Sequence, residues 1–216
     1  MIDRAEFDRF IGSRIASDGR VFVCFLAHKA MTGRVFTDVG PVAEYVDRHN
    51  RAGHGIYVCN QAPVEGWTPP PAERQTQTFD ERDGGNPPEK TDIPTRFRLQ
   101  TDADPKGDDI DAAKSEALGL LDQFTAWAAD KMIRPTIVVD SGRGIHAHFD
   151  LACPVVSGEK ADEVNAALIA WFKERATCSK WDSVQNCNRV MRCPGTVNHR
   201  TGTIVRVLRW EGMVPA

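Results

Sequence analysis

Two aspartates separated by one residue, Asp102 and Asp104, stand at the end of a segment that has strand character. Residues two apart on a strand project from the same face, so this pattern places two carboxylates side by side. Like charges so close repel unless a cation neutralises them, and carboxylate oxygens suit Mg²⁺ or Mn²⁺. An EF-hand is excluded, because position 12 of such a loop would be Ala113 instead of glutamate. The pattern predicts a divalent-metal site, and a solvated acidic turn is the alternative.

A second segment, Ser-Gly-Arg-Gly-Ile-His over residues 141–146, connects two apolar strand-like runs. Its glycines let the backbone approach a ligand closely, and consecutive N–H groups can hold phosphate oxygens. His146 then starts the next strand, where it could donate a hydrogen bond to a phosphate. The segment is not a Walker A loop, because no Lys-Ser/Thr pair follows and no helix begins there. A plain glycine-rich hairpin, or a zinc site formed by His146 and His148, are the other interpretations.

A third group of polar side chains follows in the C-terminal part of the chain. Its members are Asp182, Arg189, Arg192, Asn198, His199 and Arg200. Arginine is well suited to forked contacts with phosphate, and Asp182 offers another carboxylate. Residues 171–216 carry 8 basic and 3 acidic side chains, whereas 61–116 carry 13 acidic and 7 basic ones. This asymmetry indicates an anion-binding C-terminal third and a metal-attracting middle, although solvated surface explains any single charge.

The elements that must position these residues follow from hydrophobic periodicity and turn signals. We expect helices over 4–15, 41–52, 109–131 and 159–175, and strands over 21–27, 56–60, 96–102, 136–140, 145–151, 189–195 and 203–210. Residues 61–95 hold 7 of the 13 prolines, which predicts a proline-rich insertion or mobile loop. Alternating strands and helices indicate an α/β or α+β domain with a mixed sheet.

The composition sets broad limits on the class of protein. With 216 residues, 41% hydrophobic and 26% charged, residues 1–216 are expected to form a single globular domain. The net charge of −3 argues against a basic surface for nucleic acid over the whole molecule. We expect a cytoplasmic protein without a membrane span, since neither an 18-residue apolar run nor a secretory pattern is visible. The 6 cysteines lack a CxxC pair and are expected to be reduced.

Taken in order, three motifs carry a family resemblance: DADP at 102–105, SGRGIH at 141–146, and an aspartate followed by NRVMRCPGTVNHRTG at 188–202. This order resembles the archaeo-eukaryotic primase superfamily, and most of all the primase-polymerases of phages, plasmids and other mobile elements. The likeness covers roughly residues 40–210, including GHGIYVCNQAP before the first acids. Two features depart from the family pattern: the 61–95 segment is longer and richer in proline, and no helicase motif follows.

The resemblance implies a two-layer primase-polymerase core, in which helices flank an RRM-like mixed sheet. It implies a template-directed nucleotidyl transferase, a DNA primase or DNA polymerase, in the replication of a mobile element. Asp102, Asp104 and Asp182 would be catalytic and would hold two Mg²⁺ or Mn²⁺ ions. The residues implied in nucleotide binding are Ser141, Arg143, His146, Arg192, Asn198 and Arg200, whereas Arg189 is expected to be structural. The implied partners are a single-stranded DNA template, nucleoside triphosphates, and a helicase or another replication protein.

Three other classes of protein are compatible with parts of the sequence. A metal-dependent nuclease, or a relaxase-like protein, would also use carboxylates, histidine and arginine, but it needs no triphosphate site. A non-catalytic single-stranded-DNA-binding or replication-initiation module would bind DNA without turnover. A structural zinc protein could use Cys178, Cys187, Cys193 and His199, but their spacing lacks the short ligand pairs of common zinc sites.

Overall fold

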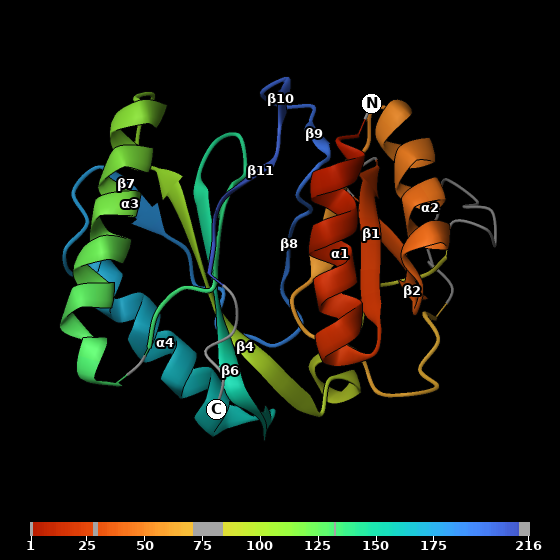
Figure 1. Ribbon diagram of the computed structural model, residues 1–216, viewed down its shortest axis with the longest axis horizontal. Helices are drawn as coiled ribbons and strands as arrows, with labels where there is room; N and C mark the ends of the chain where they lie inside the picture. The colour runs from red at the N-terminus through yellow and green to blue at the C-terminus, as the bar shows by residue number, and fades with distance from the viewer. Residues whose placement is uncertain (1, 28–29, 71–83, 132, 212–216) are drawn as a thin grey trace. The chain divides into compact units, whose positions relative to one another are not determined.

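The computed structural model describes residues 2–27, 30–70, 84–131 and 133–211 (Figure 1). The chain divides into two compact units. Unit 1 contains residues 1–95 and 187–205, and unit 2 contains residues 96–186 and 206–216. Whether the whole of 1–216 acts as one catalytic domain stays a prediction.

The described residues of unit 1 form two α-helices and a four-stranded sheet of order β2-β1-β3-β8. The helices are α1 (Arg4–Asp18) and α2 (Val39–Arg51), and the strands are β1 (Val21–Ala27), β2 (Ala30–Phe36), β3 (Gly55–Cys59) and β8 (Val190–Arg192). A short hairpin of β9 (Val197–Asn198) and β10 (Thr203–Ile204) and a 3-10 turn, η2 (Lys90–Asp92), complete it. The Asp3 side chain begins α1 by accepting from the Glu6 N–H, and Gly19 ends it at a φ of 77°.

The described residues of unit 2 form a five-stranded sheet of order β11-β5-β6-β4-β7 and two α-helices. The strands are β4 (Thr95–Pro105), β5 (Ile137–Asp140), β6 (Ile145–Val156), β7 (Ser179–Trp181) and β11 (Arg206–Trp210). The α-helices are α3 (Ile110–Trp127) and α4 (Glu159–Lys173), and a 3-10 turn, η3 (Ala129–Lys131), follows α3. The β4–β7, β5–β6 and β5–β11 pairings are antiparallel. Asp109 begins α3 by accepting from the Ala112 N–H.

One face of the unit 2 sheet is apolar and is covered by α3 and α4 (Figure 1). The buried members of this core include Leu99, Ala103, Leu121, Phe124, Ala147, Phe149, Leu168, Phe172 and Trp181. Trp181 stacks on Phe172 with ring centroids 4.1 Å apart and an interplanar angle of 10°. Because side chains alternate along a strand, the residues between these apolar positions project from the opposite face.

The α/β class with flanking helices is confirmed, and each expected helix and strand corresponds to an element of the structure. Sequence patterns missed β2, β7 and the two-residue β9, and the strand expected over 203–210 is divided into β10 and β11, which belong to different sheets. Gly33 lies in the middle of β2, and a Cβ there would lie 2.4 Å from the Val23 carbonyl oxygen, so this position requires glycine. Because glycine is not typical of a strand interior, the sequence pattern did not indicate a strand here. The β7 strand has only three residues, too few to show alternation.

The proline-rich segment that we expected over 61–95 is only partly described. Residues 71–83 lie outside the described residues. In the rest of the segment, Gly85 bridges Gly33 and a 3-10 turn forms at Lys90–Asp92. No helix in the described part of the chain is long and apolar enough to cross a membrane.

All six cysteines are free thiols, but they differ in exposure. Cys153 and Cys178 are exposed, whereas Cys24, Cys59, Cys187 and Cys193 are buried. Burial, and then the neighbouring Cys59 and Cys193, raise the pKa of the Cys24 thiol well above its ordinary value. Burial likewise raises the pKa of Cys193. These buried thiols should therefore be unreactive while the chain is folded.

We predict that Ellman's reagent modifies the two exposed thiols of the folded protein rapidly and the four buried ones only after denaturation. Rates of thionitrobenzoate release, with and without guanidinium chloride, measure this. A Cys153→Ser/Cys178→Ser double variant should lose the rapid phase. A rapid phase that persists in that variant would contradict the burial of the other four.

Candidate functional site

Asp102 and Asp104 project from the face of β4 opposite the apolar core. Ala103, which lies between them, is buried in that core, so strand alternation turns both carboxylates the other way. Both aspartates are only partly buried. The structure thus brings the first predicted pair together on a solvent-accessible strand end, as the Asp-x-Asp spacing implied.

The short strand β7 brings the third predicted carboxylate beside the first two. In the β4–β7 register, Ala103 lies opposite Trp181 and Asp104 opposite Lys180. The Asp182 N–H then donates to the Asp102 carbonyl oxygen at 2.8 Å. Because directly opposite residues share a face, Asp182 lies beside Asp102 although 80 positions separate them in sequence.

His146 reaches the same cluster from β6, the strand adjacent to β4. Its Nε2 lies 3.4 Å from Asp102 Oδ1. The His146 side chain is 6% exposed and that of Asp102 is 24% exposed, so the contact lies at the boundary between the sheet and solvent. The three aspartates and His146 therefore come from three neighbouring strands of unit 2.

The loop at 141–144 is the tight strand-to-strand connection that the sequence predicted. It joins β5 to β6, and its hydrogen bonds are largely internal. The Ser141 hydroxyl accepts from the Gly144 N–H at 3.0 Å, and the Ser141 N–H donates to the Gly144 carbonyl oxygen at 2.9 Å. The Gly142 N–H donates to Asp140 Oδ1 at 2.7 Å. These N–H groups serve the loop itself, so a phosphate contact here would fall to the Arg143 and His146 side chains.

Gly144 fixes how closely this loop approaches β4. A Cβ at this position would lie 2.2 Å from the Ala103 carbonyl oxygen and 2.9 Å from Asp104 Oδ1. Real atoms do not approach so closely, and the first neighbour is backbone, which cannot swing aside. The loop is also held to α3, because Lys114 Nζ lies 2.8 Å from Asp140 Oδ1. Gly144 thus allows the loop to lie directly against the aspartates.

We predict that Gly144→Ala destabilises unit 2 by about 1–3 kcal/mol, because the added methyl must displace the backbone of β4. It should also reduce any activity that depends on Asp104. Denaturant unfolding and an activity assay measure the two effects. Gly119→Ala is the matched control, since a Cβ there meets nothing within 4 Å. Equal stability of the two variants would refute the close approach.

Lys180 is a member of the cluster that sequence analysis missed. Its Nζ lies 2.8 Å from Asp182 Oδ1. The hydrogen bond and charge of Asp182, and then the charges of Asp104 and Asp102, raise the pKa of Lys180. The signal that could have found it is its position two residues before Asp182, which becomes informative only once β7 is known to be a strand.

Glu116 of α3 holds the segment that leads into β7. Its Oε1 accepts from the Thr177 N–H at 2.7 Å, and its Oε2 accepts from the Cys178 N–H at 3.0 Å and the Ser179 N–H at 2.7 Å. The Ser179 hydroxyl also donates to Glu116, and in turn accepts from Trp181 Nε1 at 3.1 Å. The Glu116 carboxylate thus holds in place the backbone that leads into Lys180 and Asp182. No local signal links Glu116 to residues 61–63 positions away.

These hydrogen bonds change the titration of Glu116. Burial by itself would raise its pKa, but the hydrogen bonds from Ser179, Thr177 and the backbone of 178–179 outweigh burial and lower the pKa to about 2. A carboxyl whose pKa is lower in the folded state stabilises that state above its unfolded pKa, near 4.5. The stabilisation is lost as pH falls from about 4.5 towards 2.

We predict that Glu116→Gln lowers the free energy of unfolding at pH 7 by on the order of 1 kcal/mol, a figure discounted for partial solvent exposure. The difference from the unmodified protein should shrink between pH 4.5 and about 2, where Glu116 becomes protonated. Urea denaturation at a series of pH values measures it. Glu174→Gln, which changes an exposed glutamate of the same unit, is the control. A difference in unfolding free energy between Glu116→Gln and the unmodified protein that does not vary with pH would contradict the lowered pKa of Glu116.

A divalent cation needs several ligands of suitable chemistry that converge on one point, and the aspartate cluster can be judged on both requirements. Within the described residues, no three His, Cys, Asp or Glu side chains converge closely enough to hold a metal ion. As the side chains stand, Asp102 faces His146 and Asp182 faces Lys180. The donors nevertheless are carboxylate oxygens, which Mg²⁺ and Mn²⁺ prefer, and they stand on hydrogen-bonded neighbouring strands. The chemistry of the donor set therefore fits a divalent cation.

The other predicted site residues, Arg192, Asn198 and Arg200, belong to unit 1. The Arg192 guanidinium lies over the Tyr57 ring, 4.9 Å from its centroid. Asn198 is buried, and its Oδ1 accepts from the Arg200 N–H at 3.1 Å, so it shapes the turn that displays Arg200. Arg200 is exposed, as is Arg189.

The zinc interpretations find no support among the described residues. Cys178 belongs to unit 2, whereas Cys187, Cys193 and His199 belong to unit 1. His199 Nε2 lies 2.9 Å from the Asn50 carbonyl oxygen, which gives it a structural role beside α2. His148 is buried on β6 two residues after His146.

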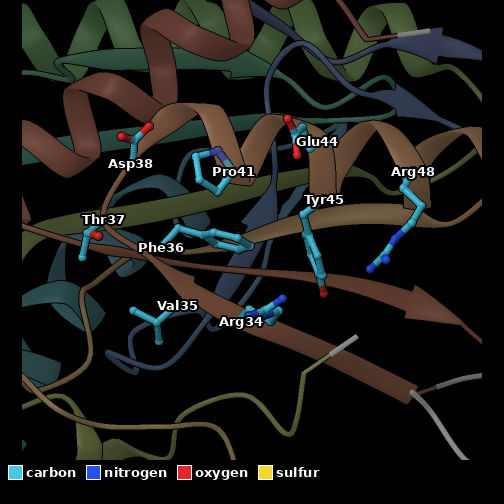
Figure 2. A pocket seen from close by; sticks show the side chains of 9 residues that line it. All are labelled: Arg34, Val35, Phe36, Thr37, Asp38, Pro41, Glu44, Tyr45 and Arg48. Carbon is cyan, nitrogen blue, oxygen red and sulfur yellow. The ribbon is translucent and has the colours of Figure 1, made fainter. Parts of the chain in front are cut away.

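Unit 1 has a separate hollow of about 560 Å³ between β2 and α2. Figure 2 shows Tyr45 and Arg48 reaching from α2 towards the strand that carries Arg34 and Phe36. Asp38 and Glu44 also line it, so two carboxylates balance the two guanidinium groups. The hollow therefore contributes no excess positive charge for a nucleic acid.

Three solved structures resemble this chain over nearly its whole length. The primase-polymerase domain of cyanophage S-2L matches with a TM-score of 0.61 and 17% identity, covering 99% of this chain and 93% of that one. The catalytic domain of the primase RepB′, solved with initiator DNA, gives 0.56 and 13% identity, covering 97% and 88%. The polymerase domain of Mycobacterium tuberculosis ligase D, solved with DNA, gives 0.53 and 16% identity, covering 96% and 81%.

No family model matches the sequence, and no curated protein matches it. The likeness therefore lies in the fold. That fold is shared with the primase and polymerase domains just named, and it is the fold that the order of the sequence motifs had suggested.

Proposed function

We propose that this chain is a template-directed nucleotidyl transferase, a DNA primase or DNA polymerase, that uses two divalent metal ions. The observation that carries the proposal is the cluster of Asp102, Asp104 and Asp182 on one face of adjacent strands, with His146 against Asp102. The primase and polymerase domains that share this fold support the same conclusion.

In this proposal Asp102, Asp104 and Asp182 hold the two Mg²⁺ or Mn²⁺ ions. Bound there, the ions supply charge neutralisation for a triphosphate and a lowered pKa for an attacking 3′-hydroxyl. The protein's own contribution is to position the reactants and to present fixed charges, which provide most of the rate enhancement in phosphoryl transfer. His146, 3.4 Å from Asp102, orients that carboxylate and can donate to a phosphate oxygen.

The remaining contacts to nucleotide are assigned by chemistry and resemblance. Arg143 projects from the loop beside Asp104 and binds phosphate, and Ser141 maintains the loop that presents it. Arg192 and Arg200 of unit 1 are assigned to triphosphate or template phosphates, with Arg192 supported by the Tyr57 ring. Asn198, proposed for the same lining, contributes by maintaining the turn that carries Arg200. Single substitutions at these residues would test each proposed role separately.

The proposed partners are nucleoside triphosphates, a single-stranded DNA template, and a helicase or another replication protein in the cytoplasm. The RepB′ structure contains initiator DNA and the ligase D polymerase domain contains DNA, which favours DNA as the template. The likeness to a phage primase-polymerase favours a role in the replication of a mobile element.

We predict that the purified protein incorporates labelled nucleotides on single-stranded DNA with Mg²⁺ or Mn²⁺, and that Asp102→Ala or Asp104→Ala reduces incorporation by about 10³-fold or more, because charge neutralisation at the phosphates is lost. Reactions with and without a primer distinguish a primase from a polymerase. Asp108→Ala is the matched control, because Asp108 is an exposed aspartate just beyond β4.

Activity that survives in the Asp102 and Asp104 variants, with their folding checked by circular dichroism, would overturn the assignment of the metal ligands. DNA binding without incorporation or triphosphate binding would favour a replication-initiation module. Cleavage of DNA without triphosphate binding would favour a nuclease.

A further inference from the structure

Lys180 is placed among the three carboxylates by the register of β7. It lies directly opposite Asp104 and two residues before Asp182, so it shares their sheet face. Its Nζ lies 2.8 Å from Asp182 Oδ1, and its side chain is 66% exposed. The ammonium group thus occupies the solvent side of the cluster that we propose as the metal site.

The contact between Lys180 and Asp182 is easy to break. An exposed ion pair is weak, because water screens the attraction and ordering a long side chain costs entropy. Lysine is also a compact charge on a flexible four-carbon stem, so its ammonium can move several ångströms without any change in the backbone. The ammonium can therefore leave Asp182 while β7 stays in register.

We propose that Lys180 holds Asp182 in the free protein, competes there with the divalent cation, and moves to the triphosphate when metal and nucleotide bind together. This inference rests on the proposed function. The Lys180 ammonium, 2.8 Å from Asp182 Oδ1, occupies one acceptor position of that carboxylate and repels a divalent ion bound to the same group. Once displaced, an ammonium on this face is attracted by the only strongly negative group that arrives with the metal, the triphosphate.

The competition has a thermodynamic consequence. When the metal binds without triphosphate, it displaces an ammonium that gains no new partner, so the metal binds more weakly than it does with triphosphate present. With triphosphate present, the displaced ammonium gains a new partner, and the metal binds more tightly. By linkage, metal and nucleotide then raise each other's affinity by the same factor, and Lys180 contributes to that factor.

The test is to titrate Mn²⁺ by electron paramagnetic resonance, with and without a non-hydrolysable deoxynucleoside triphosphate analogue. We expect Lys180→Met to bind Mn²⁺ alone about two- to fivefold more tightly, as loss of an exposed ion pair implies. The gain in Mn²⁺ affinity caused by the analogue should fall in that variant. Lys180→Arg, which keeps the charge, should bind Mn²⁺ alone as weakly as the unmodified protein.

The controls separate this inference from the proposed function. Lys173→Met removes an exposed lysine that contacts Ser183 Oγ at 2.9 Å, and it should change neither quantity. If the unmodified protein binds Mn²⁺ and Asp182→Asn weakens that binding, but Lys180→Met leaves it unchanged or weaker, the metal site stands and the inference on Lys180 is wrong. If neither the unmodified protein nor any of the variants binds Mn²⁺, with or without the analogue, the metal assignment and this inference fail together.

Discussion

The pairing of β7 with β4 is the interaction on which the candidate site depends. It spans only three residue pairs, yet it sets Asp182 beside Asp102 and Lys180 beside Asp104. A slip of one residue would reverse every side chain of β7, turning Trp181 to the polar face and Asp182 into the core. The stacking of Trp181 on Phe172 opposes that slip, since the indole fits only on the apolar side. The register of a polar cluster is thus fixed by an apolar contact on the other face of the sheet.

Along β4, the balance of charge changes from the beginning of the strand to its end. Towards the beginning of β4, the buried guanidinium groups are paired: Arg96 with Asp162, and Arg98 with Asp150 at 2.9 Å. Burying a charge is costly unless it is paired, so these arginines can lie there only with their carboxylates. Towards the end of β4 the carboxylates outnumber the cations and become more exposed. The strand therefore changes from a self-neutralised interior to an end with excess negative charge.

Much of the site could be predicted from local sequence because local rules govern it. The Asp102–Ala103–Asp104 alternation and the Gly-rich loop before His146 depend on neighbours within a few residues, and both lie where they were expected. Glu116 and Lys180 could not be found in this way. Glu116 acts through hydrogen bonds to backbone about 60 residues away, and Lys180 depends on a strand too short to leave a pattern. Ser141 was implied by the family resemblance, but its hydroxyl hydrogen-bonds within its own loop.

The far end of β6 has a consequence for the behaviour of the protein in concentrated solution. β5 begins at Ile137, opposite His148, whereas β6 continues beyond that pair to Val156 with exposed side chains, Val156 being 84% exposed. An apolar strand that extends past its neighbour can pair with the same strand of another molecule. Pro154 lies within this extension and has no N–H to donate, which interrupts such a ladder. Pro154 thus opposes self-association of the protein through the end of β6.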